Sequence, residues 1–79
     1  MYYVIKMTFI YLPPAILILE DDINPLILTV IMVAQGNLLW DNTALNHMYN
    51  KNDILRHNWY RGTFETLEQA QICACLEAL

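Results

Sequence analysis

Two cysteines, Cys73 and Cys75, are the residues of this 79-residue chain best suited to metal or redox chemistry. In an extended segment, two thiolates at this spacing could contribute to a zinc or copper site. On a helix, residues two apart lie about 200° apart around the axis, so the thiols would point to opposite sides. His47 and His57 both precede the cysteines, an order that matches no zinc-finger pattern. We therefore expect no metal and no cofactor, and two cysteines that pack as small apolar residues.

The acidic run Glu20-Asp21-Asp22 is the second candidate, either for a hard-cation site or for acid/base chemistry. It lacks the alternating acids and the central glycine of an EF-hand loop. With two glycines in the whole chain, Gly-rich phosphate-binding loops are excluded, and no nucleophile motif is present. We therefore expect no enzyme, and we interpret the run as a charged turn that could also contact a partner.

The segment from Lys51 to Arg61 holds three of the four basic residues together with His57 and two aromatic residues. Such a mixture suits single-stranded nucleic acid, and it also suits a protein–protein hot spot. The net charge of −4 favours a protein partner. An ordinary amphipathic strand with a core tryptophan remains an alternative. The candidate partner-binding residues are Arg56, Trp59, Tyr60, Arg61, Glu20, Asp21 and Asp22.

The composition predicts one folded domain over residues 1–79. Apolar residues make up 57% and charged residues 15% of the chain, whereas typical domains have about 45–50% and about 25%. This balance excludes disorder. The apolar runs are shorter than the ~20 residues of a membrane span, and no secretory signal is recognisable. With two cysteines, we expect a reducing cytoplasm, and we consider a membrane association less favoured.

The chain must be organised around an apolar block, which we predict to be a hairpin with strands at 15–20 and 26–34 and a turn at 21–25. The second run is rich in β-branched residues, which favour strands. A helix over 25–35 is the alternative, with Asn24 as N-cap, Pro25 at the first helical position and Gly36 after its end.

An apolar run of this kind needs cover on both faces. A domain of this size buries only about 60% of its unfolded surface, so we expect a homo-oligomer or an obligate partner. The C-terminal segment is also apolar around most of its circumference. The candidate interface residues are Ile31, Val33, Ile72, Leu76 and Leu79.

The remaining elements follow from local patterns. Alternation predicts a strand over 2–12 that ends at Pro13-Pro14, and a second strand over 54–64 in which Gly62 marks a bulge or the exit. Helical spacing predicts a helix over 42–50. Thr66 with Gln69 forms a capping box that begins a helix over 66–79. The resulting fold class is α+β, a small, mainly antiparallel sheet of three to four strands with one or two helices on one face.

The first functional hypothesis is a small acidic protein-binding module, an inhibitor or regulator of a larger protein, of the kind that phages and mobile elements carry. It would have no catalysis of its own. The alternative is a structural homo-oligomer or a small subunit of a larger complex, including a membrane-associated one. Both hypotheses rest on size, charge and exposed residue types, because fold alone does not imply function.

Overall fold

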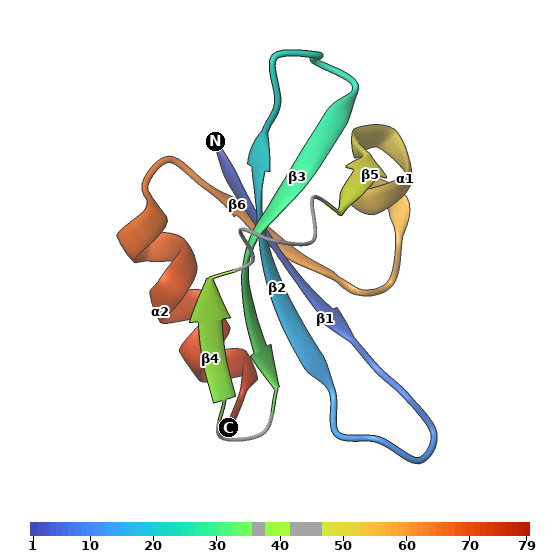
Figure 1. Cartoon of the computed structure of the whole chain (residues 1–79), viewed down its shortest axis with the longest axis vertical. Helices are drawn as coiled ribbons and strands as arrows, with labels where there is room; N and C mark the ends of the chain where they lie inside the picture. Colours follow the sequence, from blue (N-terminus) through green and yellow to red (C-terminus); the bar gives the residue numbers. More distant parts are fainter. Residues whose placement is uncertain (36–37, 42–46) are drawn as a thin grey trace.

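The computed structural model describes residues 1–35, 38–41 and 47–79. These residues form an α+β fold with an antiparallel sheet and two helices, as expected from the sequence (Figure 1). Among these residues the sheet has six strands rather than the predicted three to four, and the two helices pack on opposite faces rather than on one. In chain order the elements are β1 (Tyr2–Met7), β2 (Ala15–Asp21), β3 (Ile27–Gln35), β4 (Leu38–Asp41), β5 (Met48–Asn50), α1 (Lys51–Arg56), β6 (Tyr60–Phe64) and α2 (Leu67–Glu77).

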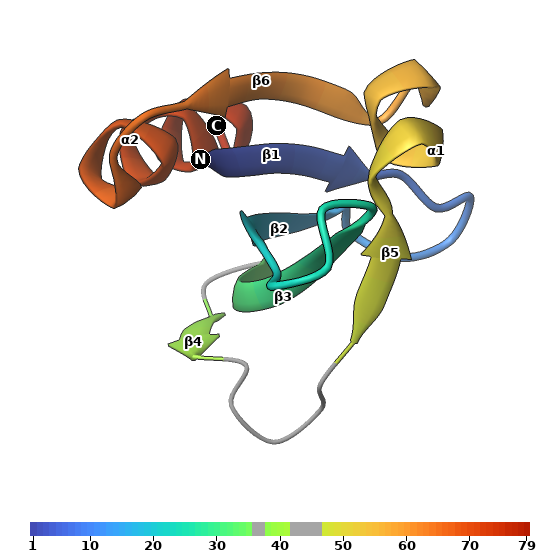
Figure 2. The same cartoon turned by 90° about the horizontal axis from the view of Figure 1, so that it is seen from above.

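The sheet has the order β4-β3-β2-β1-β6, and β5 pairs with β3 beside β4. β4 pairs with the second half of β3, residues 32–35, while β5 pairs with the first half, residues 27–29. β6 therefore forms one edge of the sheet, and β4 and β5 share the other (Figure 2). β2 lies at the centre, paired with β1 on one side and with β3 on the other.

The hairpin predicted for the apolar block is confirmed, and the alternative helix over 25–35 is wrong. Asn24 does not cap a helix; it closes the turn before β3. Its side-chain oxygen accepts from the Leu26 amide at 2.9 Å, and its carbonyl accepts from the Ile27 amide at 3.1 Å. β3 then pairs with β2 along its length, and this pairing satisfies backbone groups that a helix would have satisfied internally.

Two apolar clusters cover the two faces of the sheet. On one face, α2 packs on strands β1 and β2, as expected for the C-terminal helix; this cluster contains Val4, Ile16, Ile18, Ala70 and Ala74. On the other face, α1 contributes Ile54 to the larger cluster, which contains Tyr3, Ile5, Leu17, Leu19, Leu28, Val30 and Ile54. The period-two alternation of β1 and β2 explains the division, because successive side chains point to opposite faces.

Helix α2 lies close to the sheet because its buried positions are alanines. Ala70 and Ala74, one turn apart, are the buried residues of this helix. The predicted capping box is confirmed: the Thr66 hydroxyl accepts from the Gln69 amide at 3.2 Å, and the Gln69 side chain accepts from the Thr66 amide at 3.3 Å. The box fixes where the helix starts, and the alanines fix which side faces the sheet.

The first strand is shorter than predicted. β1 ends at Met7, which pairs with Ala15, so residues 8–14 form the connection to β2. The strand predicted over 2–12 is therefore wrong beyond Met7. Pairing decides the end, because β2 begins at Ala15 and Pro13-Pro14 supply no backbone donor that could extend the ladder.

Two further predictions are corrected in the middle of the chain. Residues 48–50 of the predicted helix over 42–50 form strand β5, while residues 42–46 lie outside the described residues. Residues 54–56 of the predicted strand over 54–64 belong to α1, and β6 begins only at Tyr60. The cause is the Asn50 cap, whose side chain accepts from the Asp53 amide at 3.1 Å and starts a helix.

The bulge predicted at Gly62 is confirmed. The register between β1 and β6 shifts where Val4 pairs with Gly62 but Ile5 pairs with Tyr60, so Arg61 is the additional residue. A Cβ at Gly62 would lie 3.0 Å from the Phe64 ring, which explains why a residue without a side chain suits this position.

The close packing of α2 can be tested by enlarging one alanine. We expect Ala74→Leu to lower the free energy of unfolding by about 1–3 kcal/mol, because the larger side chain would push α2 away from β1 and β2. Ala78→Leu, at the exposed C-cap position of the same helix, is the matched control and should change it little. Denaturant unfolding measures both; equal stability of the two variants would contradict this packing.

Candidate functional site

The three residues of the acidic run have different surroundings, and Asp21 is the one whose carboxylate binds residues distant in the sequence. Its carboxylate lies 3.1 Å from the Lys51 ammonium and 3.1 Å from the Met1 amino nitrogen, and it accepts from the Tyr3 hydroxyl at 3.0 Å. The Lys51 ammonium also lies 5.4 Å from the centre of the Tyr3 ring. Asp21 thus links β2 to α1 and to the start of β1. Glu20 is exposed, and Asp22 accepts from the Asn24 amide within the turn.

The surroundings of Asp21 determine the direction of two pKa shifts. Partial burial raises the pKa of the Asp21 carboxyl, but the hydrogen bonds from Met1, Lys51 and Tyr3 together lower it below its ordinary value. Hydrogen bonding to Tyr3 and then to Asp21 raises the pKa of Lys51. Both shifts favour the charged pair, so this cluster serves to hold β2 and α1 together.

The basic and aromatic residues between 51 and 61 do not form one surface. Trp59 and Tyr60 are half-buried and pack on the cluster that contains Ile54. Arg61 reaches to the opposite side of the sheet, where its Nε lies 3.2 Å from the Glu77 carboxylate of α2. Arg56 is exposed and pairs with Asp53 within α1 at 3.1 Å. Partner binding by these residues stays a prediction, and the structure separates them into three locations.

The two cysteines lie on different sides of α2, as expected for a helix. Cys73 is partly buried beside the sheet, whereas Cys75 is exposed, and both thiols are free. Burial, followed by the nearby Glu77 charge, raises the pKa of the Cys73 thiol. Within the described ranges, no three histidine, cysteine or acidic side chains lie together as metal ligands. No helix among these residues is long and apolar enough to cross a membrane.

The outer face of α2 carries an apolar stripe. Its members follow the spacing i, i+3, i+4 and i+7; the first three lie on the side of the helix away from the buried alanines, and the fourth lies two residues beyond the helix end at Glu77. We refer to Ile72, Cys75, Leu76 and Leu79 as the α2 stripe. Ile72, Leu76 and Leu79 are 57%, 66% and 98% exposed. Beside the stripe, a shallow hollow of about 450 Å³ is lined by Phe64, Gln69, Ile72, Cys73, Leu76 and Glu77.

The other two candidate interface residues lie in a different setting. Ile31 and Val33 belong to β3, which is flanked by β2 on one side and by β4 and β5 on the other. Ile31 packs beside the cluster under α2, while Val33 packs on the opposite cluster. Both are half-buried. The structure therefore does not join β3 and α2 into a single interface, and of the five residues only Ile72 and Leu76 on α2 and Leu79 just after it are exposed.

A second exposed apolar segment was missed by the sequence analysis. Phe9, Ile10, Tyr11 and Leu12 lie in the connection between β1 and β2 and are 41%, 89%, 95% and 61% exposed. We call residues 9–12 the apolar loop. A signal was present in the sequence, because the apolar run that starts at Ala15 is too short to pair with a strand over 2–12.

Comparison with known proteins adds no relative: no protein family, curated protein or solved structure matches this chain.

The Asp21 cluster predicts a defined pH dependence. Because its pKa is lowered in the folded chain, its stabilising contribution is complete above the ordinary value of 3.8 and is lost as the pH falls through the lower, folded value. We expect Asp21→Asn to lower the free energy of unfolding by about 0.5–1 kcal/mol at neutral pH. The difference from the unsubstituted chain should vanish well below pH 3.8. Urea unfolding of the two chains at neutral pH and at the low pH measures this difference in stability. An equal difference at the two pH values would contradict the stabilising role of the Asp21 carboxylate.

The two thiols should differ in reactivity. We expect Cys75 to react with a thiol reagent before Cys73, because Cys75 is exposed and Cys73 is partly buried with a raised pKa. Cys75→Ser should remove the fast phase, and the matched Cys73→Ser should leave it. Mass spectrometry of the labelled chain over time measures this; a fast phase that survives Cys75→Ser would contradict the orientation of α2.

Proposed function

We propose that this chain is a protein-binding module without catalysis of its own, which acts by occupying a surface on a larger protein. The observation that carries the proposal is the α2 stripe: Ile72 and Leu76 face solvent on a helix that is already packed on the sheet, and the exposed Leu79 follows the end of this helix. Exposed apolar patches of this kind mark interaction sites. The spacing also matches the anchor pattern of a helix that lies in a groove.

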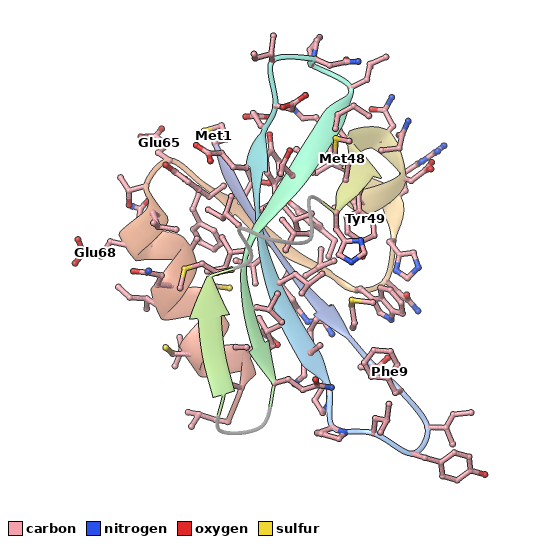
Figure 3. All side chains as sticks on the ribbon, in the orientation of Figure 1. Met1, Phe9, Met48, Tyr49, Glu65 and Glu68 are labelled. Carbon is pink, nitrogen blue, oxygen red and sulfur yellow. The ribbon has the colours of Figure 1, made fainter. Side chains whose placement is uncertain are left out.

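The charges at the N-terminal end of α2, ahead of the stripe, suggest the chemistry of the partner. Glu65 and Glu68 are exposed, and neither has an ion pair among the described residues. Figure 3 shows Glu68 projecting from α2 away from the sheet. α2 contains no basic residue. We infer that the partner presents an apolar groove with lysine or arginine side chains near it, because opposite charges around an apolar contact favour the correct partner.

A second copy of the chain suits this face less well. The basic residues nearest to it, Lys6 and Arg61, already contact Glu77, at 4.0 Å and 3.2 Å. Two copies would therefore bring an apolar stripe together without a free basic residue for Glu65 or Glu68. For this reason we propose a partner with basic residues, rather than a second copy of the chain, as the occupant of the α2 stripe.

The proposal can be tested with a synthetic helical peptide that carries leucines at the stripe spacing and lysines beside them. We expect this peptide to bind the chain, and a twin peptide with glutamates in place of the lysines to fail. Leu76→Lys should weaken binding at least about tenfold, because it places a charge in the apolar contact. Fluorescence anisotropy measures all of these affinities.

The matched control is Leu26→Lys, which adds the same charge at an exposed leucine before β3. An equal loss in both variants would mean that only net charge matters, and it would contradict the proposed face. Light scattering on the chain alone completes the test, where we expect a monomer. If the chain is a dimer and Leu76→Lys dissociates it, the α2 stripe binds a second copy of the chain and the proposal of a basic partner is wrong.

A further inference from the structure

The apolar loop between β1 and β2 is a surface that the α2 proposal does not use. It extends beyond the end of the sheet, and Phe9 lies at its start (Figure 3). From Phe9 to Leu12 the chain presents four large apolar side chains in succession, of which Ile10 and Tyr11 are 89% and 95% exposed. A run of this kind on a folded domain weakens solubility and is kept only where it has a role.

The loop is supported so that its position is defined. Its strands pair from Met7 with Ala15 to Tyr2 with Glu20. Two prolines follow Leu12, and the Gln35 side chain donates to the Pro13 carbonyl at 3.3 Å. Fixed φ angles at Pro13 and Pro14 reduce the entropy that the loop would lose on binding.

Charge is absent from the whole segment between Lys6 and Glu20. Lys6 itself donates to the Glu77 carbonyl at 2.8 Å. The acidic residues Glu20, Asp21 and Asp22 lie at the far end of β2, a strand of seven residues that spans about 20 Å. The β1–β2 hairpin is thus apolar at its tip and acidic at its base.

We propose that the apolar loop inserts into the interfacial region of a lipid bilayer with zwitterionic headgroups. A bilayer surface requires apolar side chains and favours amphipathic aromatic rings such as Tyr11 at the headgroup level, and it needs no charged rim. A protein groove would instead be expected to meet a rim of charged and polar residues around the loop, and charged residues are absent between Lys6 and Glu20.

The geometry sets the depth and the orientation of this contact. Backbone amides and carbonyls of a loop cannot enter the hydrocarbon core unsatisfied, so insertion stops about 5–10 Å into the boundary. The acidic base of the hairpin then points away from the lipid. At low salt, anionic lipids repel the net charge of −4 of the chain. High salt does not weaken the contact with zwitterionic lipid, because apolar burial supplies the attraction. This inference is independent of the α2 stripe.

The test is co-flotation of the full chain with phosphatidylcholine vesicles. We expect the chain to float with the vesicles, equally at low and high salt, and less when phosphatidylserine is added. Ile10→Asp should lower the partition coefficient at least about tenfold, because an apolar side chain leaves the bilayer and a charge replaces it. The matched control is Ile23→Asp, the same change at an exposed isoleucine in the turn between β2 and β3, which should float normally.

Circular dichroism of each variant should match that of the unsubstituted chain, because both isoleucines are exposed. The proposal is overturned if the unsubstituted chain does not float, since a protein groove would then be the remaining occupant. It is also overturned if Ile10→Asp and Ile23→Asp float equally. If Leu76→Lys abolishes flotation and Ile10→Asp does not, the lipid-binding surface is α2 and the proposal for the apolar loop is wrong.

Discussion

Strand β2 sets the constraint on which the rest of the structure depends. Its residues from Ala15 to Leu19 are all buried, so both faces of the sheet need cover at its centre. α2 covers one face, and Ile54 of α1 with Trp59 and Tyr60 covers the other. A chain of 79 residues has little further material for this purpose. The paired strands β1 and β3 protect the backbone of β2. They in turn position the outer strands, because β6 pairs with β1 and both β4 and β5 pair with β3.

The same constraint explains why apolar side chains remain outside. α2 presents alanines to the sheet, which permits a close approach, and its larger residues Ile72 and Leu76 are consequently on the outer side. In a helix that served only as cover, the large residues would be expected to face the sheet. Large apolar side chains on the outer side of α2 lower the solubility of the chain and add no buried contacts to the core. This is the physical reason for treating the outer side of α2 as a binding face.

The parts of the fold that the sequence predicted correctly depend on local interactions. The Thr66–Gln69 capping box and the Asn24 turn each involve residues close in sequence. The bulge at Gly62 is a register shift between the distant strands β1 and β6, and the glycine itself was the local signal for it. Two of the errors depend on distant partners: β1 ends at Met7 because β2 begins at Ala15, and residues 48–50 form a strand because β3 pairs with them. The third error, over residues 54–56, comes from the local Asn50 cap that starts α1. An alternating pattern shows that a segment can be a strand, but only pairing decides its length.

Contacts between residues distant in sequence also decide which charged side chains of the candidate site remain available. Arg61 and Glu77 are 16 residues apart, and Lys51 and Asp21 are 30 residues apart, so no local pattern indicates that these charges neutralise one another. A sequence shows which side chains can bind a partner, whereas the fold decides which of them are already occupied. The exposed residues of α2 were predicted from their composition, and the apolar loop was not, because alternation placed it within β1.

All four basic residues lie within 4.0 Å of a carboxylate, and three of them join elements that are separate in the chain. The charges left for recognition are therefore negative. Among the side chains that the structure describes, the acids without an ion pair are Glu65 and Glu68 at the start of α2, and Glu20 and Asp22 at the base of the β1–β2 hairpin; the hairpin tip has none. An apolar surface with neighbouring carboxylates selects a basic partner, and one without neighbouring charge selects an apolar medium. The distribution of a few unpaired acids thus gives the two exposed apolar surfaces of this small chain different chemistry.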